Sequence, residues 1–204
     1  ADGSGVTEVN TFTSVTNTNA LLLSVAANLL VDGGFETAIS DNVFIIDDTA
    51  AITNALTGTN IILTRSNTNA RTGAWSLKAA KTFGGGSACD FVIAVPLARL
   101  GTKQGMSLWY KKPGAGTGPV YFNYYYLALS KNSSGVPISA RASAAIGSAT
   151  PTFTADAVAY TRVQVTVSTP PPPWATHVAI DINMNSFVGP DSLYFDDVES
   201  TSGI

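Results

Sequence analysis

The sequence predicts an all-β fold: a jelly-roll β-sandwich preceded by an extended N-terminal arm. Three observations predict this fold class. Short segments rich in β-branched and aromatic residues recur along the chain, several of them alternate apolar and polar residues, and turn residues separate them. A chain of 204 residues can bury a sizeable core as a single domain.

The arm is predicted over residues 1–27. It is rich in β-branched residues, and almost no charge occurs between Val9 and Val31. Since a solvated tail is normally more polar, we expect the arm to pack against protein. Two alternatives stay open: the arm adds an edge strand to its own domain, or it docks on a neighbouring subunit. The sandwich is predicted over residues 28–204.

The sandwich is predicted from candidate strands that alternate with turns. The four prolines at 170–173 cannot donate ladder hydrogen bonds, and they predict a stiff polyproline II connection between two strands. Turn signals lie at 32–34, 84–86, 113–116, 133–135 and 189–191. The candidate strands are 61–64, 75–79, 91–95, 106–110, 120–127, 162–167, 178–182 and 193–195. This spacing is typical of a sandwich or jelly roll.

Composition excludes several classes of partner. Charged residues make up 12% of the chain and the net charge is -3, so we expect no basic surface for nucleic acid or anionic lipid. The most apolar stretch near the start, residues 20–31, is shorter than the about 20 residues that cross a bilayer. The single cysteine, Cys89, excludes an internal disulfide and a cysteine-based zinc site. Neither nucleic acid nor a membrane is expected as a partner.

The sequence predicts a protein that is not an enzyme. A glycoside hydrolase needs two carboxylates that face each other across a cleft. The acidic pairs 47–48 and 196–197 are adjacent in sequence, so in strands their side chains point to opposite faces. The glycines at 84–86 lack the Lys-Ser/Thr of a phosphate-binding loop, and Cys89 is better explained as a small buried residue than as a nucleophile.

A tyrosine-rich segment at 121–126 is the candidate carbohydrate-binding strand. Sugars are held by aromatic faces against their C–H surfaces, with amides and carboxylates on their hydroxyls. One face of this strand carries Tyr121, Asn123 and Tyr125, and the other carries Phe122, Tyr124 and Tyr126. One set belongs to the core and the other could line a sheet face, but the sequence does not choose between them. The candidates are Tyr121, Asn123, Tyr124, Tyr125 and Tyr126. An alternative is that the outward tyrosines pack under the arm or at a subunit contact.

Five segments, in order, resemble the cellulose- and xylan-binding jelly-roll superfamily of carbohydrate-binding modules. The resemblance covers about 28–200 and leaves the arm outside. Trp75, Trp109 and Phe195 are expected in the core, and the alternative is that they serve as platforms for a ligand. The segments are 28–36 (opening strand), 72–78, 101–111 (with the central tryptophan), 160–167 with 178–180 (late hairpin), and 191–198 (closing strand).

The resemblance also implies a structural calcium ion. Glu36 follows the opening strand, and Asp196 and Asp197 end the closing strand. In a jelly roll the first and last strands can be neighbours, which would bring these carboxylates together as a hard-cation cage. The alternative is that Glu36 or an aspartate pairs with Lys78 or Arg71 instead.

Two functions from different classes follow. The first is a virion structural protein, a phage capsid decoration (cement) or fibre subunit, in which the arm grips neighbouring subunits of a homo-oligomer and the sandwich is glycan-adhesive. The uncharged arm, the low charge and the chain end shortly after the last strand favour it. The alternative is a secreted, extracellular polysaccharide-binding module beside a glycoside hydrolase, which the five segments favour.

Overall fold

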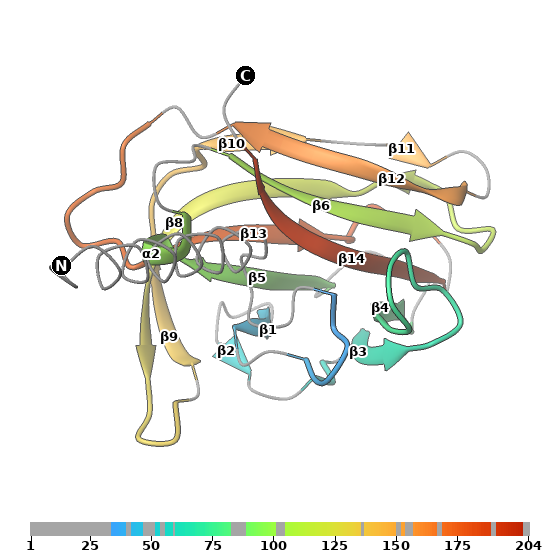
Figure 1. Cartoon of the computed structure of the whole chain (residues 1–204), viewed down its shortest axis with the longest axis horizontal. Coiled ribbons are helices and arrows are strands. Elements are labelled where there is room, and N and C mark those ends of the chain that lie inside the picture. Colours follow the sequence, from blue (N-terminus) through green and yellow to red (C-terminus); the bar gives the residue numbers. More distant parts are fainter. Residues whose placement is uncertain are drawn as a thin grey trace, which may run out of the picture.

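The structure, a computed structural model, describes residues 34–39, 42–46, 52–53, 56–58, 60–82, 89–100, 105–135, 137–149, 152–153, 157–166, 169–188 and 191–201. These residues form a jelly-roll β-sandwich of two antiparallel sheets with almost no helix (Figure 1). The predicted arm at 1–27, residues 28–33 of the predicted opening strand and the acidic pair 47–48 lie outside the described residues.

The first sheet has seven strands in the order β10-β8-β13-β5-β1-β2, and β9 pairs with the far half of β8. The pairings are antiparallel throughout. Their bounds are β1 Val43–Ile46, β2 Ile52–Thr53, β5 Asp90–Pro96, β8 Tyr121–Lys131, β9 Pro137–Ala142, β10 Gly147–Ala149 and β13 His177–Asn183.

The second sheet has five strands in the order β12-β6-β14-β4-β3. Their bounds are β3 Ile61–Ser66, β4 Ser76–Lys81, β6 Gly105–Lys112, β12 Ala157–Thr166 and β14 Ser192–Thr201. A small separate ladder joins β7 (Gly118–Pro119) to β11 (Thr152–Phe153), and the short helix α2 (Leu97–Leu100) follows β5. Each candidate strand predicted from sequence overlaps one of these strands. The short strands β1, β2, β7, β9, β10 and β11 were not predicted.

The core fills the space between the two sheets. Alternate residues of each strand point into it, as a two-layer sandwich requires. Four aromatic rings meet at its centre: the Phe91 and Phe195 centroids are 5.3 Å apart, those of Phe122 and Phe195 6.3 Å, and those of Tyr110 and Phe122 5.6 Å. Burial of this apolar surface is the main force that holds the sheets together.

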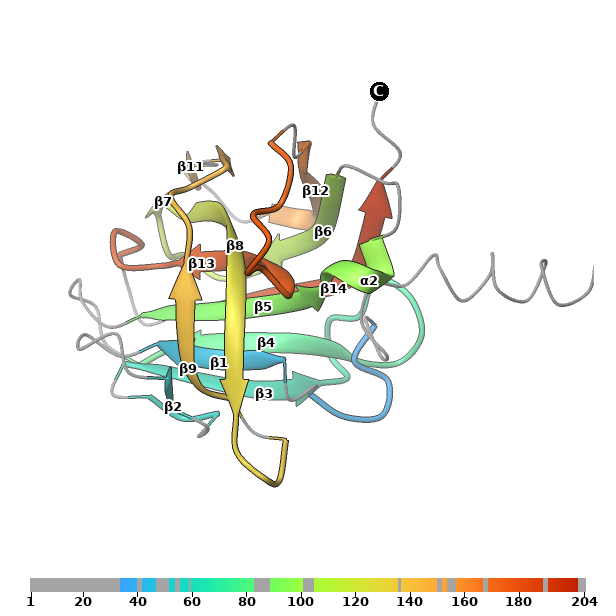
Figure 2. The same ribbon diagram turned by 90° about the vertical axis from the view of Figure 1, so that its left-hand side faces the viewer.

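The seven-stranded sheet also curls over its own outer face. The second half of β8 bends away from β13 and, with β9, crosses in front of β5 and β1 (Figure 2). A second apolar cluster lies under this hairpin; it contains Phe44, Val92, Ala94, Leu127 and Ala179, with Tyr125 and Leu129 packed against it. Lys131 Nζ donates to Asn42 Oδ1 at 2.8 Å, and β9 contacts β2 at the opposite edge of the sheet.

The proline run lies where it was predicted, between β12 and β13, and forms no strand. Beyond it, the Ala175 amide donates to the Pro172 carbonyl at 2.9 Å, and Trp174 packs against the core. Within the described ranges, no helix has the length and hydropathy needed to cross a bilayer.

Candidate functional site

The structure decides which face of the tyrosine-rich strand is outside. Phe122, Tyr124 and Tyr126 belong to the core between the sheets, and Tyr124 is 0% and Tyr126 3% exposed. Tyr126 donates its hydroxyl to the Thr169 carbonyl, and burial raises the pKa of Tyr124. Both side chains are closed to a ligand, because the facing sheet covers them. The candidate set therefore narrows to Tyr121, Asn123 and Tyr125, for which sugar binding stays a prediction.

These three residues stand beside acids and amides on neighbouring strands. Across β8, β13 and β5, Tyr121 lies opposite Asn183 and then Asp90, and Asn123 lies opposite Asp181 and then Val92. Asn123 Nδ2 donates to Asp181 Oδ2 at 3.4 Å, and Asn183 Nδ2 donates to Asp90 Oδ2 at 3.1 Å. We call this group the outer-face cluster; its members are Tyr121, Asn123, Tyr125, Asp90, Asp181 and Asn183.

Sequence reasoning missed Asp90, Asp181 and Asn183. The signal was one aspartate between two isoleucines in an otherwise apolar strand, at a position whose side chain points away from the core. That signal does not predict which residues stand beside Asp181, because the strands β5 and β8 that pair with β13 lie far away in the sequence.

The electrostatics of the cluster follow from burial. Burial raises the pKa of Asp181 to about 6, and the hydrogen bond from Asn123 opposes this rise. Asp181 Oδ1 is buried and has no hydrogen-bond partner in the described part of the chain. Burial is the largest cause that raises the pKa of Tyr125. The negative charges of Asp181 and, to a lesser extent, of Asp90 raise it further. The cluster thus holds a buried carboxylate oxygen to which no residue of the described ranges donates.

An apolar surface adjoins these polar groups. Tyr125 packs against the apolar cluster under the hairpin and remains partly exposed. Tyr121, at the other end of the row, is also partly exposed. The outer face therefore combines aromatic rings with hydrogen-bond acceptors, the combination that ligand sites for amphipathic molecules use.

A second group of carboxylates lies on the other sheet, beside the loop 71–75. Glu36 accepts from the Ala74 amide at 3.0 Å and from the Trp75 amide at 3.1 Å. Gly73 has a positive φ of +62°, and a Cβ there would overlap the Glu36 carboxylate. Arg65 donates to the carbonyls of Phe35 and Glu36 and so fixes this segment beside β3.

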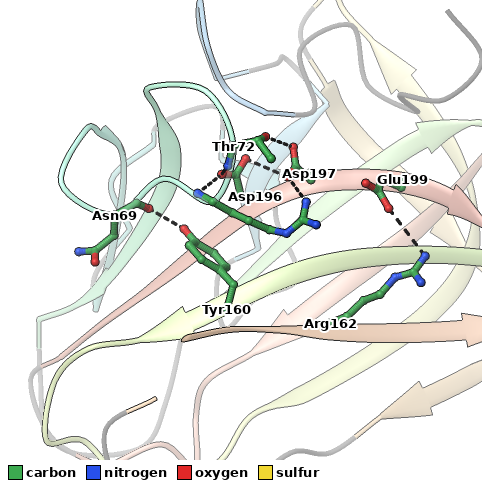
Figure 3. Close-up of polar contacts among 8 residues, drawn as sticks. Asn69, Thr72, Tyr160, Arg162, Asp196, Asp197 and Glu199 are labelled. Carbon is green, nitrogen blue, oxygen red and sulfur yellow. Dashed lines mark hydrogen bonds and ion pairs between the residues drawn. The ribbon is translucent and has the colours of Figure 1, made fainter. Parts of the chain in front are cut away.

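Asp196 and Asp197 hold the same loop from β14 (Figure 3). Asp196 accepts from the Arg71 amide at 2.7 Å and the Thr72 amide at 3.3 Å. Asp197 is ion-paired with the Arg71 guanidinium and accepts from the Thr72 hydroxyl at 2.7 Å. Just before this loop, the Tyr160 hydroxyl donates to the Asn69 carbonyl at 2.5 Å. Figure 3 shows this contact beside the aspartates.

The two aspartates do not point to opposite faces, and that expectation is corrected. The strand has a β-bulge between Asp196 and Glu199, where Asp197 takes a φ of 46°. As a result the Oδ1 atoms of both aspartates lie close to Gly34. A Cβ added to Gly34 would be 3.6 Å from Asp197 Oδ1 and 3.7 Å from Asp196 Oδ1.

The structure thus brings Glu36, Asp196 and Asp197 to one loop, as the calcium prediction required. Glu36, however, directs its oxygens at backbone amides, and Asp197 pairs with Arg71, as the alternative had it. No group of three or more His, Cys, Asp or Glu side chains within the described ranges is arranged to hold a metal ion. Calcium stays a prediction.

Of the three aromatic residues expected in the core, only Phe195 lies there. Trp75 and Trp109 are partly exposed and lie outside the core. The Arg65 guanidinium stands 4.2 Å from the Trp75 ring centroid, and that of Arg71 3.8 Å from the Trp109 ring. These stacked cations cover the indoles, which the strand pattern alone did not reveal.

No family model matches the chain, and no curated protein matches it. Solved structures match it in fold. A Bacteroides thetaiotaomicron protein whose description suggests sugar binding is 12% identical, with 86% of this chain and 100% of that chain covered and a TM-score of 0.53. A structure described for carbohydrate-binding modules of the β-sandwich superfamily is 13% identical. The match covers 87% of this chain and 64% of that chain, with a TM-score of 0.52.

The C-terminal family 22 carbohydrate-binding module of Clostridium thermocellum Xyn10B is also 13% identical, with 85% of this chain and 96% of that chain covered and a TM-score of 0.49. At such identities the likeness is one of fold. The chain therefore shares its β-sandwich fold with the two structures that match it at TM-scores of 0.53 and 0.52.

Proposed function

We propose that this protein is a non-catalytic carbohydrate-binding domain that holds a polysaccharide on the outer face of its seven-stranded sheet. The observation that carries the proposal is the outer-face cluster, in which the partly exposed Tyr121, Asn123 and Tyr125 share one sheet face with Asp181 and Asn183 of the next strand.

The chemistry of a sugar suits this cluster. A sugar presents hydroxyl donors around its rim and C–H groups on its ring faces. These hydroxyls would form hydrogen bonds with the partly exposed side chains of Asn123, Asp181 and Asn183. The partly exposed rings of Tyr121 and Tyr125 would pack against the C–H groups.

The two carboxylates of the cluster favour binding over hydrolysis. Asp90 and Asp181 come from adjacent strands, and their side chains leave the same face of one sheet. The acid and nucleophile of a glycoside hydrolase flank the scissile bond from different sides. Carboxylates that stand side by side, each hydrogen-bonded to an asparagine, are better suited to orienting hydroxyls.

Affinity electrophoresis tests the proposal. The protein is run through gels that contain xylan or β-glucan, and we expect retardation that Tyr121→Ala abolishes. The matched control is Tyr160→Ala, which removes a partly exposed tyrosine from the other sheet. Circular dichroism of both variants checks that they fold.

Two results would contradict the proposal. The first is that no polysaccharide retards the protein. The second is that Tyr160→Ala weakens retardation as much as Tyr121→Ala does, because binding would then not involve the outer face.

A second candidate, a virion structural protein, keeps its support in the sequence of residues 1–27, which is almost uncharged from Val9 onward. We propose that this arm docks on neighbouring subunits of a homo-oligomer. Size-exclusion chromatography with light scattering tests it: the whole chain should form an oligomer. A monomer at all concentrations would favour the secreted polysaccharide-binding module instead.

A further inference from the structure

A row of polar residues crosses the outer face of the five-stranded sheet, and we call it the lysine row. Its members, each paired with the next across β3, β4, β14 and β6, are Thr64, Lys78, Tyr194 and Lys111. Lys78 lies between the core residues Leu77 and Ala79, so its side chain points to the outer face. Paired residues of neighbouring strands share a face, and the whole row therefore lies outside the core.

The two lysines carry positive charge that the described acids do not neutralise. Lys78 and Lys111 are partly exposed, and neither forms an ion pair with a carboxylate of the described ranges. The acids nearby on β14 have other cations: Asp197 is paired with Arg71, and Glu199 stands 3.7 Å from an arginine of β12 (Figure 3). Two ammonium groups thus remain open to an anion from solution.

The surroundings give these ammonium groups a defined spacing. One strand separates Lys78 from Lys111, so their Cα atoms lie two strand spacings apart, roughly 10 Å. Tyr194 stands between them in the row and is 7% exposed. The Lys111 ammonium is 5.9 Å from the centroid of the Tyr160 ring, whose hydroxyl donates to a backbone carbonyl. The row therefore presents two separated cations on a packed, largely aromatic floor.

We propose that the lysine row binds acidic polysaccharides through the carboxylate groups of the sugar chain. This site is separate from the outer-face cluster, since it lies on the other sheet and takes another class of ligand. A lysine ammonium is a compact point charge that suits a single carboxylate. A polyuronate repeats its carboxylate along the chain, so one molecule can place a carboxylate at each lysine while its hydroxyls reach the exposed Thr64.

Other anionic partners suit this face less well. A protein partner normally buries an apolar anchor, but the exposed large apolar residues of the described ranges, Ile138 and Val188, lie outside the five-stranded sheet. A nucleic acid needs a longer run of cations along its phosphates. Here two lysines stand alone, and Asp197 and Glu199 on β14 would repel a continuous phosphate backbone.

The experiment compares polygalacturonate with its fully methyl-esterified form, which has the same chain but no charge. In affinity electrophoresis at low salt, we expect the acidic form to bind about tenfold more tightly than the ester, as two exposed charge pairs would give. Added salt should narrow the difference, because it screens exposed charges. Tyr121→Ala should leave the binding of polygalacturonate unchanged, since it alters the other sheet.

Variants show whether the two lysines carry the binding. Lys78→Met and Lys111→Met should each weaken binding of polygalacturonate about threefold, and the double variant about tenfold, because exposed charge pairs contribute modestly and independently. Lys111→Arg keeps the charge and should keep most of the binding. The matched control is Lys131→Met, which removes the same charge from an exposed lysine of the seven-stranded sheet and should change nothing. Circular dichroism checks that each variant folds.

The outcomes separate this inference from the proposed function. If polygalacturonate and its ester bind equally, or if Lys131→Met weakens binding as much as Lys111→Met, the lysine row is not the site, while retardation by xylan or β-glucan that depends on Tyr121 still supports the proposed function. If only polygalacturonate binds, the proposed function fails and the inference stands. Duplex DNA serves as a second polyanion, and binding of DNA with the same dependence on Lys78 and Lys111 would overturn the assignment to polysaccharides.

Discussion

Asp181 shows how burial shapes the chemistry of a single residue. Its carboxyl lies on a sheet face between Asn123 and Val92, and burial raises its pKa to about 6, from 3.8 for an aspartate in water. Such a group binds a proton more tightly in the folded chain than in the unfolded chain. It therefore lowers folding stability as the pH rises between these two values.

Sugar binding should show the opposite pH dependence. A hydroxyl that donates to Asp181 stabilises the charged carboxylate, so affinity for a neutral polysaccharide should rise as the pH increases from about 5 to about 8. The groups that face Asp181 are Asn123, Asp90 and the Tyr125 phenol, whose pKa is raised above 10.0. Affinity electrophoresis across this range checks it. A flat profile for the wild type, or an unchanged rise in Asp181→Asn, would contradict it.

Gly73 is a second residue whose role is explained by geometry. Its positive φ and the nearby Glu36 carboxylate both exclude a side chain. We expect Gly73→Ala to lower the free energy of unfolding by about 2–4 kcal/mol, since strain and overlap add.

Gly135 provides the matched control. It has a φ of +81°, and a Cβ there would meet nothing within 4 Å. Gly135→Ala should therefore cost only the backbone strain, about 1 kcal/mol. Urea denaturation measures the free energy of unfolding of both variants. Equal losses in Gly73→Ala and Gly135→Ala would show that overlap with Glu36 adds nothing to the cost.

The calcium prediction concerns the carboxylates at the same loop. If calcium binds beside Asp196 and Asp197, excess calcium should raise the Tm of chelator-treated protein, because a ligand of the native state stabilises it by mass action. Magnesium serves as the control, and Asp196→Asn should abolish the shift. A Tm that does not change on adding either ion would leave these carboxylates with their hydrogen-bonding role alone.

At the scale of elements, Lys81 connects β4 to the turn after β13. The side chain is 3% exposed, and its ammonium donates to the carbonyls of Met184, Asn185 and Phe187. The strands β4 and β13 belong to different sheets, so this contact links the two layers of the sandwich. The Lys81 ammonium therefore donates to three carbonyls of the turn that follows β13.

Removing this cation should loosen the turn. Lys81→Met keeps the aliphatic stem but deprives buried carbonyls of their donor, so we expect a loss of about 2–4 kcal/mol in the free energy of unfolding. Lys78→Met is the matched control, because Lys78 lies on the opposite face of the same strand and is partly exposed; it should change stability by less than about 0.5 kcal/mol. Equal effects in chemical denaturation would contradict this role.

At the scale of the whole molecule, the described strands of the two sheets run from β1 to β14, within residues 43–201. We expect a chain that lacks residues 1–27 to keep its β-sheet circular dichroism and its Tm within a few degrees, since every core strand of the described ranges is retained. Assembly of the whole chain, if it depends on the arm, should be lost. Unfolding of the shortened chain would instead make the arm an integral strand.

Much of the fold could be predicted from sequence because strands carry a local signal. β5, β6, β8 and β13 are apolar or alternating runs bounded by turns, and each was predicted. The short strands β1, β2 and β9 were not, because a few residues next to glycine, proline or asparagine carry no period. The alternation in β8 also predicted its two faces, but both faces carry tyrosines, so hydrophobicity did not tell inside from outside.

The sequence by itself determined the all-β class and the positions of the main strands along the chain, and it predicted that Glu36 could lie near Asp196 and Asp197. Only the tertiary structure decided that Tyr124 and Tyr126 face the core and that Asp90 and Asp181 stand beside Tyr121 and Tyr125. The reason is that period and composition act between neighbours in the chain, whereas strand order and register join segments separated by many residues, and a ligand-binding face is made from those joined segments.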